Sequence, residues 1–169
     1  MSDTNRESDP KAEALAAKIA QHFRDVPYPG DACLVALSDR CDPERLEIQS
    51  AFEGKSWRDL PLDFLRYHHE SLFLFTPAAY QFYLPAYLLA CTLSYEAAGN
   101  ILSSVVFSLT LPVGFGIERT RFLDRMSRFS SSQKKTITAF LRLLRERHSE
   151  DFPRKELDAV LRSFWSRFR

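Results

Sequence analysis

The sequence predicts an all-α protein, a compact bundle of about six to seven helices around one kinked, apolar central helix. The 169 residues are 45% hydrophobic and 27% charged, which is the composition of an ordinary globular protein of one domain. Five glycines against nine prolines leave few of the glycine turns that a many-stranded sheet requires. Apolar residues recur at three- and four-residue steps along most of the chain. We expect residues 1–8 to form a disordered tail and residues 9–169 to form a single helical domain.

The first two helices are predicted by the same start signal. Asp9-Pro10 and Asp42-Pro43 each combine a side chain that caps a helix with a proline at the first helical position, where its missing N–H costs nothing. The first helix should end before a Pro-Tyr-Pro-Gly run, and Gly54 should close the second. The short apolar run 33–37 between them is ambiguous between a buried turn and a strand.

The next two helices begin at prolines. A third helix is expected near Pro61, with His69 and Phe73 on its apolar side. A fourth should run from Pro77 to about Ser94 and is apolar nearly all round, which is typical of a helix at the centre of a bundle. Pro85 lies inside this central helix. Because proline removes a helical hydrogen bond and clashes with the preceding turn, we predict a kink there.

The C-terminal half is expected to add further helices. The run 101–109 has helical spacing but many β-branched residues, so the pattern predicts burial without deciding between helix and strand. Another apolar stripe begins at Ile117. Ser130 and Gln133 have the spacing of a capping box for the following helix, and the last helix should start near Pro153.

Two stretches without charged residues, 71–95 and 97–117, are long enough to cross a bilayer. Prolines and polar residues dilute the apolar content of both, so we interpret them as buried core and expect no membrane span. The N-terminal residues are too polar for a secretion signal, and three cysteines fit a reducing compartment. A cytoplasmic location is therefore expected, with a local disulfide between Cys33 and Cys41 as the alternative.

The net charge of +1 conceals an asymmetry along the chain. Residues 1–70 carry nine basic and fourteen acidic side chains, whereas residues 118–169 carry fourteen basic and seven acidic. Either the two ends pack together and neutralise each other, or the basic end binds an acidic protein or a phosphate backbone. The candidate partner-binding residues are Arg121, Arg125 and Arg128, which share one helical stripe. Among residues four positions earlier only Asp124 is acidic, so Arg121 and Arg125 are expected to lack a partner within the helix.

Motifs for a reaction or a cofactor are not found in the sequence. It has no His or Cys spacing typical of a metal site, no glycine-rich phosphate loop and no Gly-x-Ser-x-Gly, so we predict no catalytic residue, no metal ligand and no cofactor. Tyr80, Tyr83 and Tyr87 share one face of the central helix and, with His69, are candidates for a pocket. The alternative is that the tyrosine rings fill the core while their hydroxyls bind carbonyl groups.

Three blocks of the chain carry a shared pattern. Residues 57–61 (W-R-D-L-P) match W-x-x-L-P, and residues 74–90 (L-F-T-P-A-A-Y-Q-F-Y-L-P-A-Y-L-L-A) are similar to F-L-T-P-x-A-x-x-Y-L-P-A-Y. Residues 129–141 are similar to L-T-P-x-Q-x-x-x-I-x-x-F-L, with Ser131 at the position of the proline. These blocks resemble a family of small bacterial proteins of unknown function. The resemblance implies a bacterial source and a helical fold, and it implies no catalytic residue.

These observations favour a non-enzymatic domain that binds another protein, with an immunity or antitoxin-like role as one concrete form. Two alternatives stay open. One is a nucleic-acid-associated accessory protein that uses the basic C-terminal third. The other is an enzyme whose site is assembled from scattered residues such as His69 and Tyr83. The sequence does not define the oligomeric state.

Overall fold

The computed structural model describes residues 9–36, 42–148 and 154–169, and in these ranges it is an all-α bundle with nine α-helices and no strand, as the sequence predicts. The predictions for the tail 1–8, for Cys41 and for a helix start near Pro153 lie outside the described residues. Short 3₁₀ turns η1 to η4 connect or extend the helices. The α-helices are α1 (Pro10–His22), α2 (Pro43–Phe52), α3 (Leu62–Tyr67), α4 (Pro77–Leu93), α5 (Tyr95–Ala98), α6 (Asn100–Ser108), α7 (Ile117–Ser127), α8 (Ser131–Arg147) and α9 (Arg154–Ser163).

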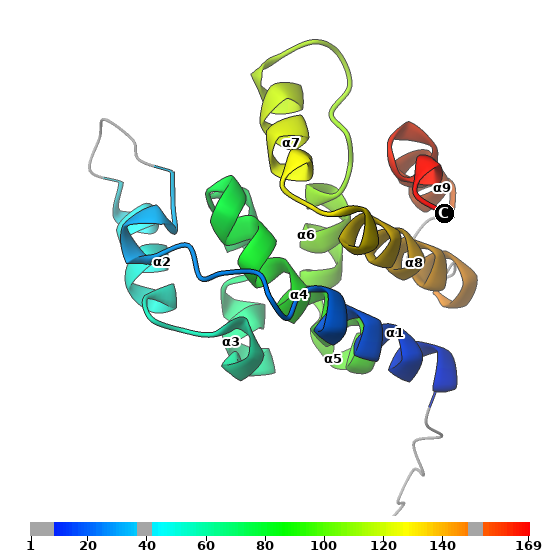
Figure 1. Ribbon diagram of the computed structural model, residues 1–169, viewed down its shortest axis with the longest axis horizontal. Coiled ribbons are helices and arrows are strands. Elements are labelled where there is room, and N and C mark those ends of the chain that lie inside the picture. Colours follow the sequence, from blue (N-terminus) through cyan, green and yellow to red (C-terminus); the bar gives the residue numbers. More distant parts are fainter. Residues whose placement is uncertain (1–8, 37–41, 149–153) are drawn as a thin grey trace, which may run out of the picture.

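Helix α4 lies at the centre of the bundle, where it contacts α1, α6 and α7 (Figure 1). Its residues 82–88 are all buried, because an almost uniformly apolar sequence lets every face of the helix pack against a neighbour. Pro85 lies inside α4 and is itself buried, and the helix continues on both sides of it. The proline therefore does not end the central helix. The kink stays a prediction.

The predicted helix starts are confirmed by the capping groups. The Asp9 carboxylate accepts hydrogen bonds from the backbone N–H groups of Lys11 and Ala12, and Asp42 accepts one from Glu44. Before α8 both bonds of the capping box are present, since Ser130 Oγ accepts from the Gln133 N–H at 3.2 Å and Gln133 Oε1 accepts from the Ser130 N–H at 3.0 Å. These starts depend on residues within one turn of each other, which is why the sequence predicts them well.

Three segments either differ from the predicted structure or are left ambiguous by the sequence. The third helix is shorter than expected: α3 ends at Tyr67, and His69–Phe73 forms the separate 3₁₀ turn η3. The Tyr87 hydroxyl donates to the His68 carbonyl at 2.8 Å, so a side chain of α4 satisfies a backbone group at this break. The run 33–37 combines the end of η1 (Asp31–Cys33) with a single antiparallel bridge between Val35 and Phe75, while Leu37 lies outside the described residues. The run 101–109 is helical in α6.

One hydrophobic core extends from α1 to the C-terminal turn η4 (Trp165–Arg167). Trp165 is completely buried, and its indole Nε1 donates to the Leu109 carbonyl at 2.8 Å, which connects the C-terminus to the end of α6. Gln133 connects three helices, because its Oε1 also accepts from Gln81 of α4 and its Nε2 donates to the His22 carbonyl of α1. In the ranges that the structure covers, no helix is both long enough and apolar enough to cross a bilayer.

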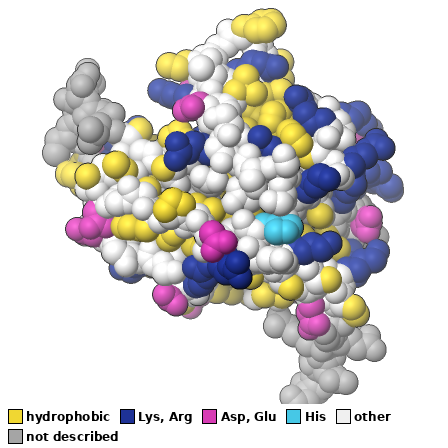
Figure 2. Space-filling view, in the orientation of Figure 1, with side chains coloured by type: hydrophobic (Ala, Val, Ile, Leu, Met, Phe, Trp, Pro, Cys, Tyr) yellow, Lys and Arg dark blue, Asp and Glu magenta, His cyan; other side chains and the backbone are white. Residues whose placement is uncertain are grey.

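The two oppositely charged ends of the chain meet only locally. Among the described residues, two ion pairs join residues 1–70 to residues 118–169, Asp9 with Arg147 and Lys11 with Glu146. In the second pair the basic residue comes from the acidic end, so that pair adds nothing to neutralisation between the ends. Figure 2 shows Lys and Arg side chains gathered over the side of the molecule where Figure 1 places α8 and α9. Most of the positive charge therefore faces solvent.

Candidate functional site

The row of tyrosines on α4 belongs to the core. Tyr80, Tyr83 and Tyr87 have no exposed surface. The Tyr83 hydroxyl lies 2.9 Å from the carbonyl oxygens of both Phe52 and Lys55, and the Tyr80 hydroxyl lies 2.8 Å from Ser108 Oγ. The rings therefore fill the core while their hydroxyls satisfy polar groups of other segments. The prediction that the three tyrosines form a pocket with His69 is wrong, because their rings are enclosed by packed side chains.

Burial changes the acidity of this row. The pKa of Tyr80, Tyr83 and Tyr87 lies above the ordinary tyrosine value of 10, chiefly because burial penalises the charged tyrosinate. The pKa of the buried Cys91 thiol is raised for the same reason. These groups stay neutral at physiological pH, so they act as packing and hydrogen-bonding groups rather than as bases.

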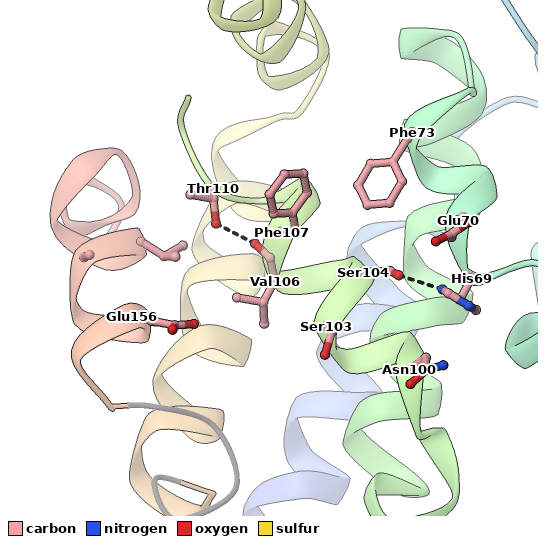
Figure 3. A pocket seen from close by; sticks show the side chains of 12 residues that line it. His69, Glu70, Phe73, Asn100, Ser103, Ser104, Val106, Phe107, Thr110 and Glu156 are labelled. Atoms are coloured by element: carbon pink, nitrogen blue, oxygen red, sulfur yellow. Dashed lines mark hydrogen bonds between the residues drawn. The ribbon is translucent and has the colours of Figure 1, made fainter. Parts of the chain in front are cut away.

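His69 lies in a different place, at a cavity of about 740 Å³ between η3, α6 and α9 (Figure 3). We call it the α6 cavity. Its volume is in the range that small-molecule sites occupy. The residues that line it include His69, Glu70, Phe73, Phe107, Glu156 and Val160.

The polar groups of the α6 cavity include a histidine and a serine within hydrogen-bond distance of each other. His69 Nδ1 lies 2.8 Å from Ser104 Oγ, the spacing of a hydrogen bond, but Ser104 is buried on the inner face of α6. Within the described residues His69 has no second hydrogen-bond partner that would orient its ring, which an activated serine–histidine pair requires. Tyr83, the other residue of the enzyme alternative, is not among the lining residues. In the same ranges no group of three or more His, Cys, Asp and Glu residues is arranged to hold a metal.

The arginine stripe divides into three different environments. Arg121 forms an ion pair with Glu118 at 2.9 Å, so the expectation that it lacks a partner within α7 is wrong, because the pairing runs over three residues rather than four. Arg125 packs inward: its guanidinium lies 4.9 Å from the centre of the Tyr80 ring and donates to the Leu72 carbonyl at 3.3 Å. The Arg128 side chain is exposed and has no ion-pair partner among the described residues, and it does not pair with Asp124.

An exposed apolar segment precedes α7. Val113 and Phe115 are each 103% exposed and Ile117 is 65% exposed, so the expectation that all of 97–117 is buried core is wrong at its C-terminal end. Pro112 and the two glycines around Phe115 prevent helix formation, and Gly114 has the positive φ of +88° that favours glycine. Figure 2 shows hydrophobic atoms protruding at the end of the molecule where Figure 1 places the loop before α7.

The exposed residues of this loop and of the outer face of α7 together form a candidate surface. We call it the tip surface and define it by Val113, Phe115, Ile117, Arg121 and Arg128. Ile117, Arg121 and Arg128 are four and seven residues apart, so they share one face of α7. Sequence reasoning finds the arginines but misses the apolar part, whose signal is the Gly-Phe-Gly interruption within an otherwise helix-compatible run.

The chain was compared with protein families, curated proteins and solved structures. A family of unknown function, DUF6714, matches residues 11–169, and the chain belongs to this family. No curated protein and no solved structure matches the chain. The predicted membership in a family of unknown function is therefore confirmed.

Proposed function

We propose that this protein is a non-enzymatic domain that binds an acidic protein partner through the tip surface. The observation that supports the proposal most strongly is the complete exposure of Val113 and Phe115 at one end of the molecule. Burial of a large apolar side chain contributes about 1.5–3 kcal/mol, so two such residues held in water provide a strong driving force for association. Aromatic and arginine side chains are also the types enriched in the centres of protein interfaces.

Charge indicates the chemistry of the partner. Residues 118–169 carry a net charge of +7, and Lys and Arg side chains gather over the side of the molecule where α8 and α9 lie. Such a field accelerates the approach of an acidic surface, and Arg128 is available for pairing at contact. We therefore propose that the partner presents an apolar pocket for Phe115 with acidic residues at its rim.

The nucleic-acid alternative has weaker support. The basic surface over α8 and α9 would suit a phosphate backbone, but single-stranded nucleic acid is usually held by exposed aromatic rings as well. On this side Phe164 and Trp165 are buried. The exposed aromatic ring nearest in sequence to the stripe is Phe115, at the tip rather than on the basic surface. Protein binding uses both features of the tip and is therefore the preferred proposal.

A site-specific crosslinking experiment tests the proposal. A photoreactive phenylalanine analogue replaces Phe115 in one variant and Leu46, which is 55% exposed on the distant helix α2, in the control. Expressed in the source cells and illuminated, the Phe115 variant should capture one acidic protein that the Leu46 variant does not capture. The double substitution Arg121→Glu, Arg128→Glu should reduce this capture about tenfold, because it reverses two charges at the contact. Arg125 is left unchanged since it packs on the core.

Three results would reject the proposal. These are capture of the same proteins from both positions, capture that survives the charge reversal, and transfer of the crosslink to nucleic acid or lipid instead of protein.

An immunity or antitoxin-like role in the cytoplasm is one form of the proposed binding. In that form the captured protein should be a toxin encoded beside this chain.

A further inference from the structure

We propose that the α6 cavity binds an organic cation, an amine that carries an apolar chain or ring. This site is separate from the tip surface. It lies between η3, α6 and α9, whereas the tip surface lies on the loop before α7 and on the outer face of α7 (Figures 1 and 3). The cavity volume of about 740 Å³ exceeds what such a ligand needs, and exposed residues such as Ser103 and Phe107 line it, so access does not require the bundle to open.

The cavity lining contains two carboxylates and no Lys or Arg, with His69 as its one basic side chain. Glu70 comes from η3 on one side and Glu156 from α9 on the other, and none of the twelve lining residues is Lys or Arg. This is unexpected in a chain with 23 Lys and Arg residues whose helix α9 contains three of them. Within the described residues neither Glu70 nor Glu156 forms an ion pair or a hydrogen bond. The ion pair that α9 makes uses Asp158 instead. A bound cation would therefore meet carboxylates that no described cation already pairs.

The remaining lining suits the apolar part of such a ligand. The rings of Phe73 and Phe107 lie 5.6 Å apart and nearly perpendicular, and Phe107 is 71% exposed. Val160 adds an aliphatic surface from α9. Aromatic faces attract cations, and apolar walls favour a hydrocarbon chain, so a single ligand with both parts satisfies the whole lining.

The polar residues of α6 add hydrogen-bond acceptors. Ser103 and Asn100 are exposed at the cavity and offer a hydroxyl and an amide oxygen, which accept from an ammonium group. Carboxylates that form no ion pair repel anions. The lining therefore selects by charge as well as by apolar character, and a neutral ligand of the same shape should bind more weakly than the amine, with the carboxylate weakest.

A series of three probes with the same hydrocarbon chain tests this selection. Octylamine, octanol and octanoate are titrated separately into the full-length protein near neutral pH at low salt, and amide chemical shifts are followed by NMR. We expect shifts confined to η3, α6 and α9, with octylamine binding about tenfold more tightly than octanol, since two partly exposed carboxylates each contribute up to about fivefold. Octanoate should bind most weakly.

Matched variants assign the effect to the cavity. Glu70→Gln with Glu156→Gln should reduce octylamine binding to the level of octanol and leave octanol binding unchanged. Glu96→Gln, which removes an exposed carboxylate on α5 outside the cavity, should retain the full preference. Ser103→Phe places a ring in the cavity from an exposed position, so it should weaken binding of both ligands while the melting temperature stays unchanged.

The proposal would be overturned by equal binding of octylamine and octanol, or by a preference that persists when both glutamates are replaced. It would also be overturned by an absence of shifts around α6 up to the solubility limit of octylamine. None of these readouts involves Phe115 or Arg128, so the result is independent of the partner proposed for the tip surface.

Discussion

The Tyr83 hydroxyl joins the central helix to the segment that follows α2, because it lies within hydrogen-bond distance of the carbonyl oxygens of Phe52 and Lys55. We expect Tyr83→Phe to lower the free energy of unfolding by about 1–3 kcal/mol, since the ring is retained while the Lys55 carbonyl loses this donor and the Phe52 carbonyl keeps only the Lys55 N–H. Chemical denaturation measures this change. Tyr67→Phe is the matched control: Tyr67 is 74% exposed, and its loss of a hydroxyl should change stability by less than about 0.5 kcal/mol. Equal effects of the two substitutions would show that the buried hydroxyl has no structural role.

The buried tyrosines also predict how stability depends on pH. Because burial raises the pKa of Tyr80, Tyr83 and Tyr87 above 10, the unfolded chain loses these protons at lower pH than the folded protein. Stability should therefore be unaffected by these groups below pH 10 and should fall above it, by up to about 1.4 kcal/mol per pH unit for each tyrosine.

An alkaline titration followed by circular dichroism and by tyrosinate absorbance tests this expectation. The tyrosinate absorbance of the buried Tyr80, Tyr83 and Tyr87 should appear together with the loss of helix. Complete ionisation of all six tyrosines in a protein that is still helical would contradict the assigned burial.

At this scale the sequence predicts residue type and face better than residue role. It places the tyrosine row on one face of α4, but it does not indicate that Arg125, predicted as a partner-binding residue, packs inward with its guanidinium over the Tyr80 ring. That contact joins residues 45 positions apart and depends on how α7 packs against α4. Periodicity within a single helix contains no information about such packing.

Among the elements, α4 depends on a proline in its middle. We expect Pro85→Ala to destabilise the protein by about 1–3 kcal/mol: the alanine permits a straighter helix, which would strain a core packed around the present shape. Pro77→Ala is the control, since Pro77 occupies the first helical position, and it should cost less than about 1 kcal/mol. Denaturation midpoints of both variants decide the question. An unchanged midpoint for Pro85→Ala would mean that the central helix is not shaped by its proline.

Helix starts and helix ends differ in how well the sequence predicts them. The starts at Asp9, Asp42 and Ser130 are specified by groups within one turn, and all three are predicted. The end of α3 is not, because the break at His68 is stabilised by the hydroxyl of Tyr87, which lies 19 residues away. The exposure of Phe115 is missed for a related reason, since a charge-free run does not show where the chain leaves the bundle.

For the molecule as a whole, the fold class follows from composition and periodicity, whereas the candidate sites do not. The α6 cavity is lined from three elements that span residues 69–160, and its acidic residues belong to stretches that show no motif. The sequence feature that points to the cavity is Phe107, a large apolar residue that lies outside the apolar stripe of α6. The resulting molecule has an acidic cavity in a protein whose C-terminal third is basic, so the two proposed sites select ligands of opposite charge.

The continuous core predicts that residues 9–169 unfold as one unit. Trp57 lies in η2 (Trp57–Asp59) near α4, and Trp165 lies in η4 against α6 and α8, so the two tryptophans report on distant parts of the same core. Trp57→Phe should cost little hydrogen-bonding energy, because the indole Nε1 of Trp57 has no partner among the described residues. Trp165→Phe should cost about 1–3 kcal/mol more, because it leaves the Leu109 carbonyl without its donor.

In each variant the remaining tryptophan's fluorescence and the circular dichroism should give the same denaturation midpoint, as two-state unfolding of a single domain requires. Fluorescence of Trp165 that changes before or after the loss of helix would instead divide the chain into two independently unfolding parts, with the boundary at the contact between Trp165 and α6.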